Sequence, residues 1–246
     1  GLAHSRTGRL VAIGTRDPKR PGLAESFPGA RIVEGYQALI DDPEVEAIYV
    51  ATPHTGHAEW AIKAAEGGKH VLVEKPMGIS AAEAEAMIHA ARKAGTFLAE
   101  AFMYRVHPMT AKLVELVATG AVGEVRKMQS SFGFALPWKP EHRLLANDTA
   151  GGGILDVGCY PASIVRLLAG AAAGKPFLEP SSIAGVGHLG ETGVDEWASA
   201  VLKFPNEIVA EISCSVSLQQ DNTLRVFGTT GWLEVKDFWF ASGKEG

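Results

Sequence analysis

Residues 9–100 alternate between short apolar runs and segments with helical periodicity. The clearest helix begins after Ser80, which forms a capping box with Glu83, and ends at Gly95. Short apolar strands separated by helices are typical of a parallel sheet with helices on its faces. We therefore predict a doubly wound α/β domain over residues 1–100. Its strands are expected at 10–13, 47–51, 71–73 and 96–100, and its other helices at 19–27, 36–42 and 54–66.

The remaining residues, 101–246, have a different pattern. Two helices are expected, at 109–118 and from the residue after Gly153 to about 169. Apolar and polar residues then alternate in successive segments, and turn residues such as Pro205 and Asn206 separate them. Strands joined by such hairpins form a sheet with one apolar face. We predict an α+β domain with an open, largely antiparallel sheet, whose strands are expected at 125–135, 198–204, 208–218, 224–227 and 232–235.

The composition restricts the classes of partner. The chain of 246 residues is 46% hydrophobic and 21% charged, so it has enough apolar side chains to fold around a core. Its net charge of −5 disfavours an extended basic surface for nucleic acid. No run of 18 apolar residues is present, so we expect no membrane span. Two cysteines, Cys159 and Cys214, are too few for a disulfide framework and fit the reducing cytoplasm.

The chain is expected to continue beyond both ends of this sequence. Its first residue is Gly1, and residues 1–6 have the pattern of the last turns of a helix that stops at Gly8. The loop G-x-G-x-x-G of dinucleotide-binding domains is absent, so we expect that loop and the first strand upstream. That first strand is central in such sheets. We therefore expect a gap between the strands at 10–13 and 47–51.

The first candidate site is Thr15-Arg16-Asp17, which follows the strand at 10–13. In dinucleotide-binding folds, an acidic residue near the adenosine ribose favours a free 2′-hydroxyl, and an arginine there favours a 2′-phosphate. Thr15 and Arg16 precede Asp17, which favours NADP, with NAD as the alternative. A solvated charged turn explains these residues equally well.

The second candidate site is the segment 51–57, which follows a buried strand. The carboxyl ends of strands line the ligand crevice in open α/β sheets. His54 and His57 have the spacing of a metal pair, but no third ligand lies nearby in the sequence, and zinc sites need three or more. We therefore expect a cofactor crevice rather than a metal site, formed by Ala51, Thr52, Pro53, His54 and His57.

The third candidate site is Glu74-Lys75-Pro76, again at the end of an apolar strand. A Glu-Lys pair is usually a surface pair. Here a proline follows and restricts the backbone of Lys75 to an extended path. A lysine in that place can offer a fixed positive charge, or can lose a proton if it is desolvated.

The fourth candidate site is the segment 151–160, Gly-Gly-Gly-Ile-Leu-Asp-Val-Gly-Cys-Tyr. The glycines open a helix and allow a close approach of other backbone. Asp156 and Tyr160 are four residues apart, so they lie on one face of that helix and can reach one pocket. A neighbouring lysine ammonium favours the phenolate form of a tyrosine, which would suit Tyr160 to carry a proton. A packed helix with a buried tyrosine is the structural alternative.

Together these segments resemble the glucose–fructose oxidoreductase/inositol dehydrogenase (Gfo/Idh/MocA) family. The resemblance covers nearly the whole chain and rests on Glu74-Lys75-Pro76, the 51–53 strand end with His57, and the segments 99–108 and 151–160. Tyr160 makes the chain most similar to the dihydrodiol dehydrogenase and NADP-dependent xylose dehydrogenase branch, because inositol dehydrogenases carry histidine at that position.

The resemblance implies a Rossmann domain followed by a substrate domain whose open sheet commonly forms a dimer interface, and hence a homodimer or homotetramer. It also implies Lys75 and Tyr160 at the nicotinamide of NADP or NAD, with Asp156 and Arg105 at the substrate. We therefore expect an oxidoreductase that moves a hydride between nicotinamide and a carbinol carbon of a sugar or cyclic trans-diol. Glu74 is expected beside Lys75 in the cofactor site.

Two other functions remain open on the same fold. A cofactor-binding regulator would bind the nucleotide without turnover, although a regulator has no need of both Lys75 and Tyr160. The other is an enzyme that cleaves glycosides with NAD as a redox catalyst, which the tyrosine at the end of the 151–160 motif disfavours.

Overall fold

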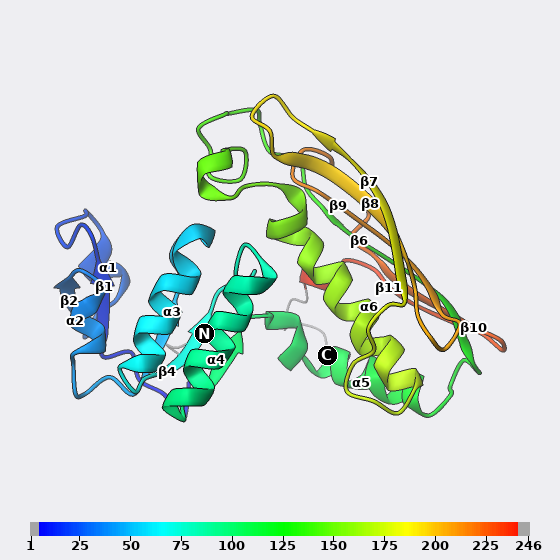
Figure 1. Cartoon of the computed structure of the whole chain (residues 1–246), viewed down its shortest axis with the longest axis horizontal. Helices are drawn as coiled ribbons and strands as arrows, with labels where there is room; N and C mark the ends of the chain where they lie inside the picture. Colours follow the sequence, from blue (N-terminus) through cyan, green and yellow to red (C-terminus); the bar gives the residue numbers. More distant parts are fainter. Residues whose placement is uncertain (1–4, 241–246) are drawn as a thin grey trace. The chain divides into compact units, whose positions relative to one another are not determined.

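The computed structural model describes residues 5–240 and divides the chain into two compact units, Gly1–Ala101 and Phe102–Gly246. The expected helical end at residues 1–6 therefore lies largely outside the described residues. So does the segment after Phe240. Figure 1 shows the elements of both units in their order along the chain.

The strands of the first unit are all parallel, as predicted, but they form two sheets. One sheet pairs β1 (Ala12–Thr15) with β2 (Arg31–Glu34). The other has the order β3 (Ala47–Val50), β4 (His70–Val73) and β5 (Leu98–Glu100). Within residues 5–240, β1 pairs only with β2, and β3 only with β4, so the gap expected between the first two predicted strands is present. The strand β2 was not predicted.

Helices connect these strands and pack on them. They are α1 (Leu23–Ser26), α2 (Gln37–Ile40), the 3₁₀ turn η2 (His54–Gly56), α3 (His57–Glu66) and α4 (Ala81–Ala94). The predicted start of α4 is confirmed, since Ser80 Oγ accepts a hydrogen bond from the Glu83 amide at 3.2 Å. Glu83 Oε2 in turn accepts the Ile79 amide at 3.0 Å. Gly95, with φ of 70°, ends the helix in the left-handed conformation.

Helices precede most of the strands in the second unit. The chain runs through η3 (Met103–Val106), α5 (Pro108–Ala118), β6 (Val125–Gly133) and η4 (Asn147–Thr149). A π-helical turn, η5 (Ile154–Gly158), leads directly into α6 (Cys159–Ala172). The remaining elements are β7 (Ser182–Leu189), β8 (Asp195–Lys203), β9 (Val209–Ser215), β10 (Leu224–Gly228), β11 (Trp232–Val235) and η6 (Phe238–Phe240).

One six-stranded sheet, in the order β11-β10-β6-β9-β8-β7, organises this unit. The predicted hairpins β8–β9 and β10–β11 are both antiparallel, and so are the pairs β7–β8 and β10–β6. The pair β6–β9 is parallel, so the sheet is mixed at its centre. The edge strand β7 was not predicted, because all eight of its residues are exposed and Gly185 and Gly187 interrupt any alternation.

The helix α6 lies along one face of this sheet (Figure 1). Its apolar side chains Ile164, Val165 and Leu168 are fully buried and share a core with Met128 and Ala210 of the sheet. The segment 147–172 is long and apolar enough to cross a membrane, because its most apolar window of 18 residues has a mean hydropathy of 1.3, but 61% of that window is buried in the described structure. Packing against the sheet accounts for that composition, and the absence of a membrane span stays a prediction.

Candidate functional site

The carboxyl ends of β3, β4 and β5 bring two of the candidate sites to one edge of a sheet. The three strands are parallel and in register, with Val50 beside Val73 and Val73 beside Glu100. The segment 51–57 therefore starts beside the Glu74-Lys75 segment, as strand ends do in a ligand crevice. The Lys75–Pro76 peptide bond is cis, and Lys75 is half-buried.

His57 joins the two segments. Its ring is 1% exposed, with Nδ1 at 2.7 Å from the Pro76 carbonyl oxygen and Nε2 at 2.9 Å from the Thr52 carbonyl oxygen. Both ring nitrogens thus contact backbone oxygens, which leaves neither for a metal ion or a cofactor. The sequence predicted His57 as a cofactor-binding residue. In the structure its ring connects the segments that contain Thr52 and Pro76, which would themselves bind the cofactor.

The Glu74 carboxylate is held by its neighbours on the same edge. It accepts hydrogen bonds from the Tyr49 hydroxyl and, at 3.2 Å, from the Lys75 amide. Burial of the Tyr49 phenol raises its pKa to about 12, and the hydrogen bond and charge of Glu74 act in the same direction. Glu100, at the end of β5, accepts the Met77 amide at 2.7 Å. These bonds fix the backbone on both sides of Lys75.

The segment Thr15-Arg16-Asp17 forms a turn at the end of β1. Thr15 Oγ1 accepts the Asp17 amide at 3.2 Å, and Asp17 Oδ1 accepts the Lys19 amide at 3.1 Å. The Asp17 carboxylate is thus used in its own turn, whereas the Arg16 side chain is exposed and forms no ion pair within residues 5–240.

In the second unit, the glycines of segment 151–160 allow backbone and side chains to approach closely, as predicted. A Cβ on Gly151 would lie 2.6 Å from the Leu144 carbonyl oxygen, and one on Gly152 would lie 2.3 Å from Asp195 Oδ1. Gly152 also has φ of 112°, which L side chains rarely adopt. Asp195 was not identified from the sequence, because it lies 41 residues beyond the Ile154 amide that it contacts.

Asp156 and Tyr160 both lie at the buried start of the α6 helix. Their exposed fractions are 4% and 6%. The prediction of one regular helix was wrong here, because Asp156 lies in the π-helical turn and Tyr160 in the first turn of α6. Arg143 Nη1, on the loop after β6, lies 3.9 Å from Asp156 Oδ1. The buried carboxylate thus has a half-exposed cation beside it.

Aromatic rings enclose Tyr160. Phe102, Phe132 and Trp239 meet it edge to face, with ring centroids at 5.1, 5.1 and 5.4 Å. Tyr104 lies at 6.0 Å. Edge-to-face contacts of this kind fix the plane of a ring. The cluster therefore fixes the direction of the phenol group.

Arg105 has partners inside the second unit. Its Nη2 donates to Ser163 Oγ at 2.6 Å, its Nε donates to the Tyr104 hydroxyl at 3.1 Å, and its guanidinium lies 4.5 Å from the Phe177 ring centroid. Burial raises the pKa of Tyr104, and Ser163 and Arg105 oppose that shift. These contacts give Arg105 a packing role against α6 whether or not it also reaches a substrate.

Comparison with known proteins identifies the family. Residues 1–102 match the model described as oxidoreductase family, NAD-binding Rossmann fold, and residues 110–234 match the GFO/IDH/MocA C-terminal domain. The chain belongs to the GFO/IDH/MocA family. The Rossmann assignment agrees with the parallel sheets of the first unit, and the C-terminal match covers the helices and sheet of the second.

Several characterised relatives of this GFO/IDH/MocA chain are dehydrogenases. It is 36% identical to mouse trans-1,2-dihydrobenzene-1,2-diol dehydrogenase over 94% of this chain and 67% of the relative. It is also 36% identical to D-xylose 1-dehydrogenase (NADP(+)) 2 of Haloferax volcanii, over 92% and 67%. The chain thus spans about two thirds of the length of these relatives, and the branch expected from the motifs is confirmed at the level of similarity.

Solved structures of the family have the same fold. An aldose-aldose oxidoreductase from Caulobacter crescentus, complexed with glycerol, matches with a TM-score of 0.85 at 30% identity over 98% of this chain and 73% of that one. KijD10, a 3-ketoreductase from Actinomadura kijaniata in complex with NADP and TDP-benzene, matches with a TM-score of 0.83 at 30% identity over 97% and 71%.

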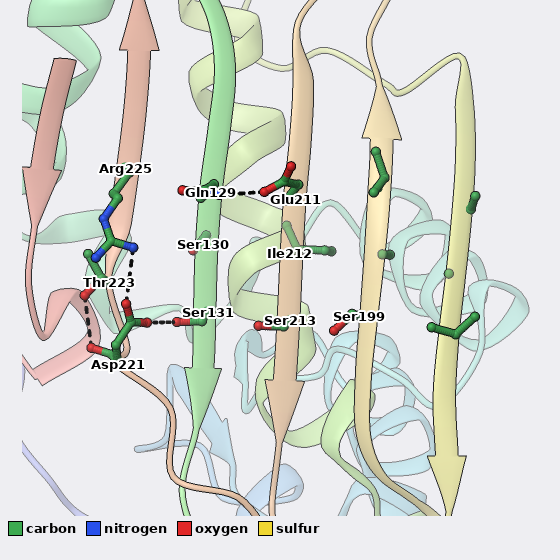
Figure 2. A pocket seen from close by; sticks show the side chains of 15 residues that line it. Gln129, Ser130, Ser131, Ser199, Glu211, Ile212, Ser213, Asp221, Thr223 and Arg225 are labelled. Atoms are coloured by element: carbon green, nitrogen blue, oxygen red, sulfur yellow. Dashed lines mark hydrogen bonds and ion pairs between the residues drawn. The ribbon is translucent and has the colours of Figure 1, made fainter.

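The open face of the six-stranded sheet carries a hollow that the sequence did not indicate (Figure 2). It has a volume of about 550 Å³, and polar side chains cross it in rows. Gln129 Nε2 donates to Glu211 Oε2 at 2.6 Å, and Ser131 Oγ donates to Asp221 Oδ1 at 2.5 Å. Asp156 and Tyr160 belong to the helix on the opposite face of the sheet, so the hollow is not part of their site.

No metal centre is found in the part of the chain that the structure describes. Across residues 5–240, no group of three His, Cys, Asp or Glu side chains is placed to hold a metal ion. The pair His54 and His57, with ring centroids 5.7 Å apart, packs edge to face instead.

Proposed function

We propose that the protein is an NADP-dependent oxidoreductase that acts on a carbinol carbon of a sugar or cyclic trans-diol. The observation that carries this proposal is the burial of Asp156 and Tyr160 together at the glycine-rich start of α6. Buried ionisable side chains that lie close together are common in active sites. The family and the named activities of the dehydrogenase relatives support the same reaction class.

The residues of the first unit fit a nicotinamide dinucleotide. The edge formed by β3, β4 and β5 offers backbone groups after each strand, and the Thr52 hydroxyl oxygen is buried there without a hydrogen-bond partner in the described chain. The exposed Arg16 can bind a 2′-phosphate, and Lys75 can bind an oxygen of the substrate or cofactor. NADP is the cofactor in the KijD10 complexes.

The protein side of the reaction needs a proton carrier and a positive charge. When bound, the nicotinamide supplies the ring that accepts or donates hydride. In the proposed mechanism, Tyr160 takes the proton from the substrate hydroxyl during oxidation and returns it during reduction. Lys75 stabilises the negative charge that develops on that oxygen. Asp156 orients a neighbouring hydroxyl group.

A substrate panel tests the proposal. Aldoses, cyclic polyols and trans-dihydrodiols are added to the complete protein with NADP and, separately, with NAD, and the absorbance of the reduced nicotinamide is followed. Turnover of at least one class supports the proposal. Binding of NADPH, seen by fluorescence, without turnover of any substrate would instead indicate a regulator.

The Arg16→Ala substitution should raise the KM for NADP far more than the KM for NAD. The guanidinium would lose a charge-assisted bond to the 2′-phosphate, which NAD lacks, and such bonds contribute about 1.5–3 kcal/mol, or roughly 10–100-fold. Steady-state kinetics with each cofactor measure the difference. Arg92→Ala, an exposed arginine at the end of α4, is the control and should change neither KM. Equal changes in both KM values for Arg16→Ala would rule out this role.

We also propose that the open sheet face pairs two copies of the chain. Its strand β7 is exposed along its whole length, and Val186 of β7 and Val201 of β8, which line the hollow, are 79% and 46% exposed. Apolar side chains of this kind lie beside the polar rows of the hollow (Figure 2). An exposed sheet face that carries apolar side chains together with hydrogen-bonding groups suits a self-complementary two-fold interface.

The Val186→Glu substitution should convert such a dimer into monomers. In a two-fold interface each substitution appears twice, so two carboxylates would be buried without partners. Sedimentation velocity of the complete protein measures the mass. Phe97→Glu, at a 66% exposed apolar residue of the first unit, is the control and should leave the mass unchanged. A dimer that persists in the Val186 variant would contradict the assignment of this face.

A further inference from the structure

The helix that carries Asp156 and Tyr160 begins without a cap of its own. The first amides of a helix have no partner within the helix, and a Ser, Thr, Asp or Asn side chain at the N-cap usually accepts from one of them. Here the N-cap is Gly153, which has no side chain to do so. The glycines that allow the close approach described above therefore leave the helix start dependent on another part of the chain.

Asp195, the first residue of β8, supplies the missing acceptor. Its Oδ2 accepts the Ile154 amide at 2.6 Å, and the Gly153 amide also donates to the carboxylate. Gly152 is required for this contact, because a Cβ there would lie 2.3 Å from Oδ1. The carboxylate charge also lies at the positive end of the helix dipole, where a negative charge is stabilising.

The Asp195 side chain is partly buried. Burial raises the pKa of this carboxyl group, while the bonds from the Ile154 and Gly153 amides oppose the shift. The contact also lies close to Asp156 in the chain. Ile154 lies two residues before Asp156, and the Asp156 amide donates to the Gly152 carbonyl oxygen at 3.2 Å. A shift of the Gly152–Ile154 backbone would therefore displace Asp156 and, through the turn, Tyr160.

We propose that Asp195 is a positioning residue, which holds the first turn of the helix so that the side chains of Asp156 and Tyr160 are correctly placed for the reaction. This role rests on the proposed function. Asp195 does not touch the reacting atoms in this assignment. It acts through the backbone of Gly153 and Ile154, so its loss should reduce kcat while the binding of NADP stays the same.

Two substitutions and two measurements test the proposal in the complete protein. Asp195→Ala removes both acceptor oxygens, and Asp195→Asn keeps the volume and one oxygen that can accept. We expect Asp195→Ala to lower kcat by about 10²-fold, the effect of a misplacement of about 1 Å, with the KM for NADP unchanged. Asp195→Asn should recover part of that loss. Hydrogen–deuterium exchange of the amides of 154–158 should be about tenfold faster or more in Asp195→Ala, because a bond to a charged acceptor is lost.

Glu179→Gln is the matched control. Glu179 pairs with Arg166, which lies in the middle of α6 and away from its first turn, and both side chains are more than a third exposed. This variant should keep the kcat and the 154–158 exchange of the wild type. If Asp195→Ala does not fold, Asp195→Asn tests the proposal instead. Its kcat should be lower than that of the wild type, by less than about 10²-fold.

The outcomes separate this proposal from the proposed function. Turnover by the wild-type protein tests the function, and the ratio of variant to wild type tests Asp195. Wild-type kcat in Asp195→Ala overturns the positioning role, with or without faster exchange. A rise in the KM for NADP with kcat unchanged also overturns it. If the wild type turns over no substrate, the proposed function fails, and the role of Asp195 in catalysis fails with it.

Discussion

Replacing Tyr160 with phenylalanine is expected to lower kcat by about 10²–10⁴-fold, the usual contribution of general acid–base catalysis, while NADP still binds. The substitution removes only the hydroxyl group. The ring keeps its edge-to-face contacts with Phe102, Phe132 and Trp239, so the fold around it should be preserved. Steady-state kinetics with the best substrate of the panel, together with NADPH fluorescence titration, measure the two effects separately.

Tyr104→Phe is the matched control for this experiment. Tyr104 belongs to the same aromatic cluster and its hydroxyl accepts a hydrogen bond from Arg105, so the variant also loses one buried hydroxyl. We expect it to cost stability, on the order of 1 kcal/mol, with little change in kcat. If Tyr160→Phe keeps nearly full turnover, Tyr160 is a packed core residue, and only the cofactor-binding part of the proposed function remains.

The Lys75→Met substitution should also lower kcat strongly, because methionine keeps most of the length of the side chain but loses the charge that would stabilise the substrate oxygen. If Lys75 and Tyr160 act on the same oxygen, their effects are not independent. The double variant should then lose much less activity than the product of the two single losses. Residues that act separately would give losses that multiply.

The control for Lys75 is Lys63→Met, at an exposed lysine of α3 that pairs with Glu59. Exposed ion pairs of this kind contribute little, so kcat should stay at the wild-type value. A wild-type kcat in Lys75→Met, or a double variant whose loss equals the product of the single losses, would contradict a shared role.

The sequence predicted the elements whose signals are local. The capping box at Ser80 and the left-handed Gly95 bound α4, and turn residues at Pro205 and Asn206 marked the β8–β9 hairpin. The strands β2 and β7 lacked such signals. The strand β2 has four residues, none of them buried, and β7 is an edge strand with glycines and no buried side. Alternation reports burial on one face, so strands without that burial do not produce it.

Contacts between residues far apart in the chain could not be predicted from sequence patterns. The 51–57 and Glu74-Lys75 segments were each predicted to follow a strand of a parallel sheet, and the structure places those two strand ends side by side. By contrast, nothing near Asp195 indicates that its carboxylate accepts from the Ile154 amide, because hydrogen-bond partners that far apart in the chain leave no periodicity. The π-helical turn before α6 was missed for a related reason. Its residues lead directly into α6, so the apolar pattern does not separate the two.

The parallel pairing of β6 with β9 has a consequence for the time at which the second unit can fold during synthesis. The neighbours of β6 in the sheet are β9 and β10. The strand β6, which ends at Gly133, therefore cannot pair until the ribosome has made residues 209–228. Until then both of its edges lack partners, and unpaired edges invite association between chains. Such distant pairings also slow folding, since the entropy cost of closing the intervening loop comes before the gain from the contacts. Nascent chains that stall before residue 209 should therefore be those most in need of chaperones.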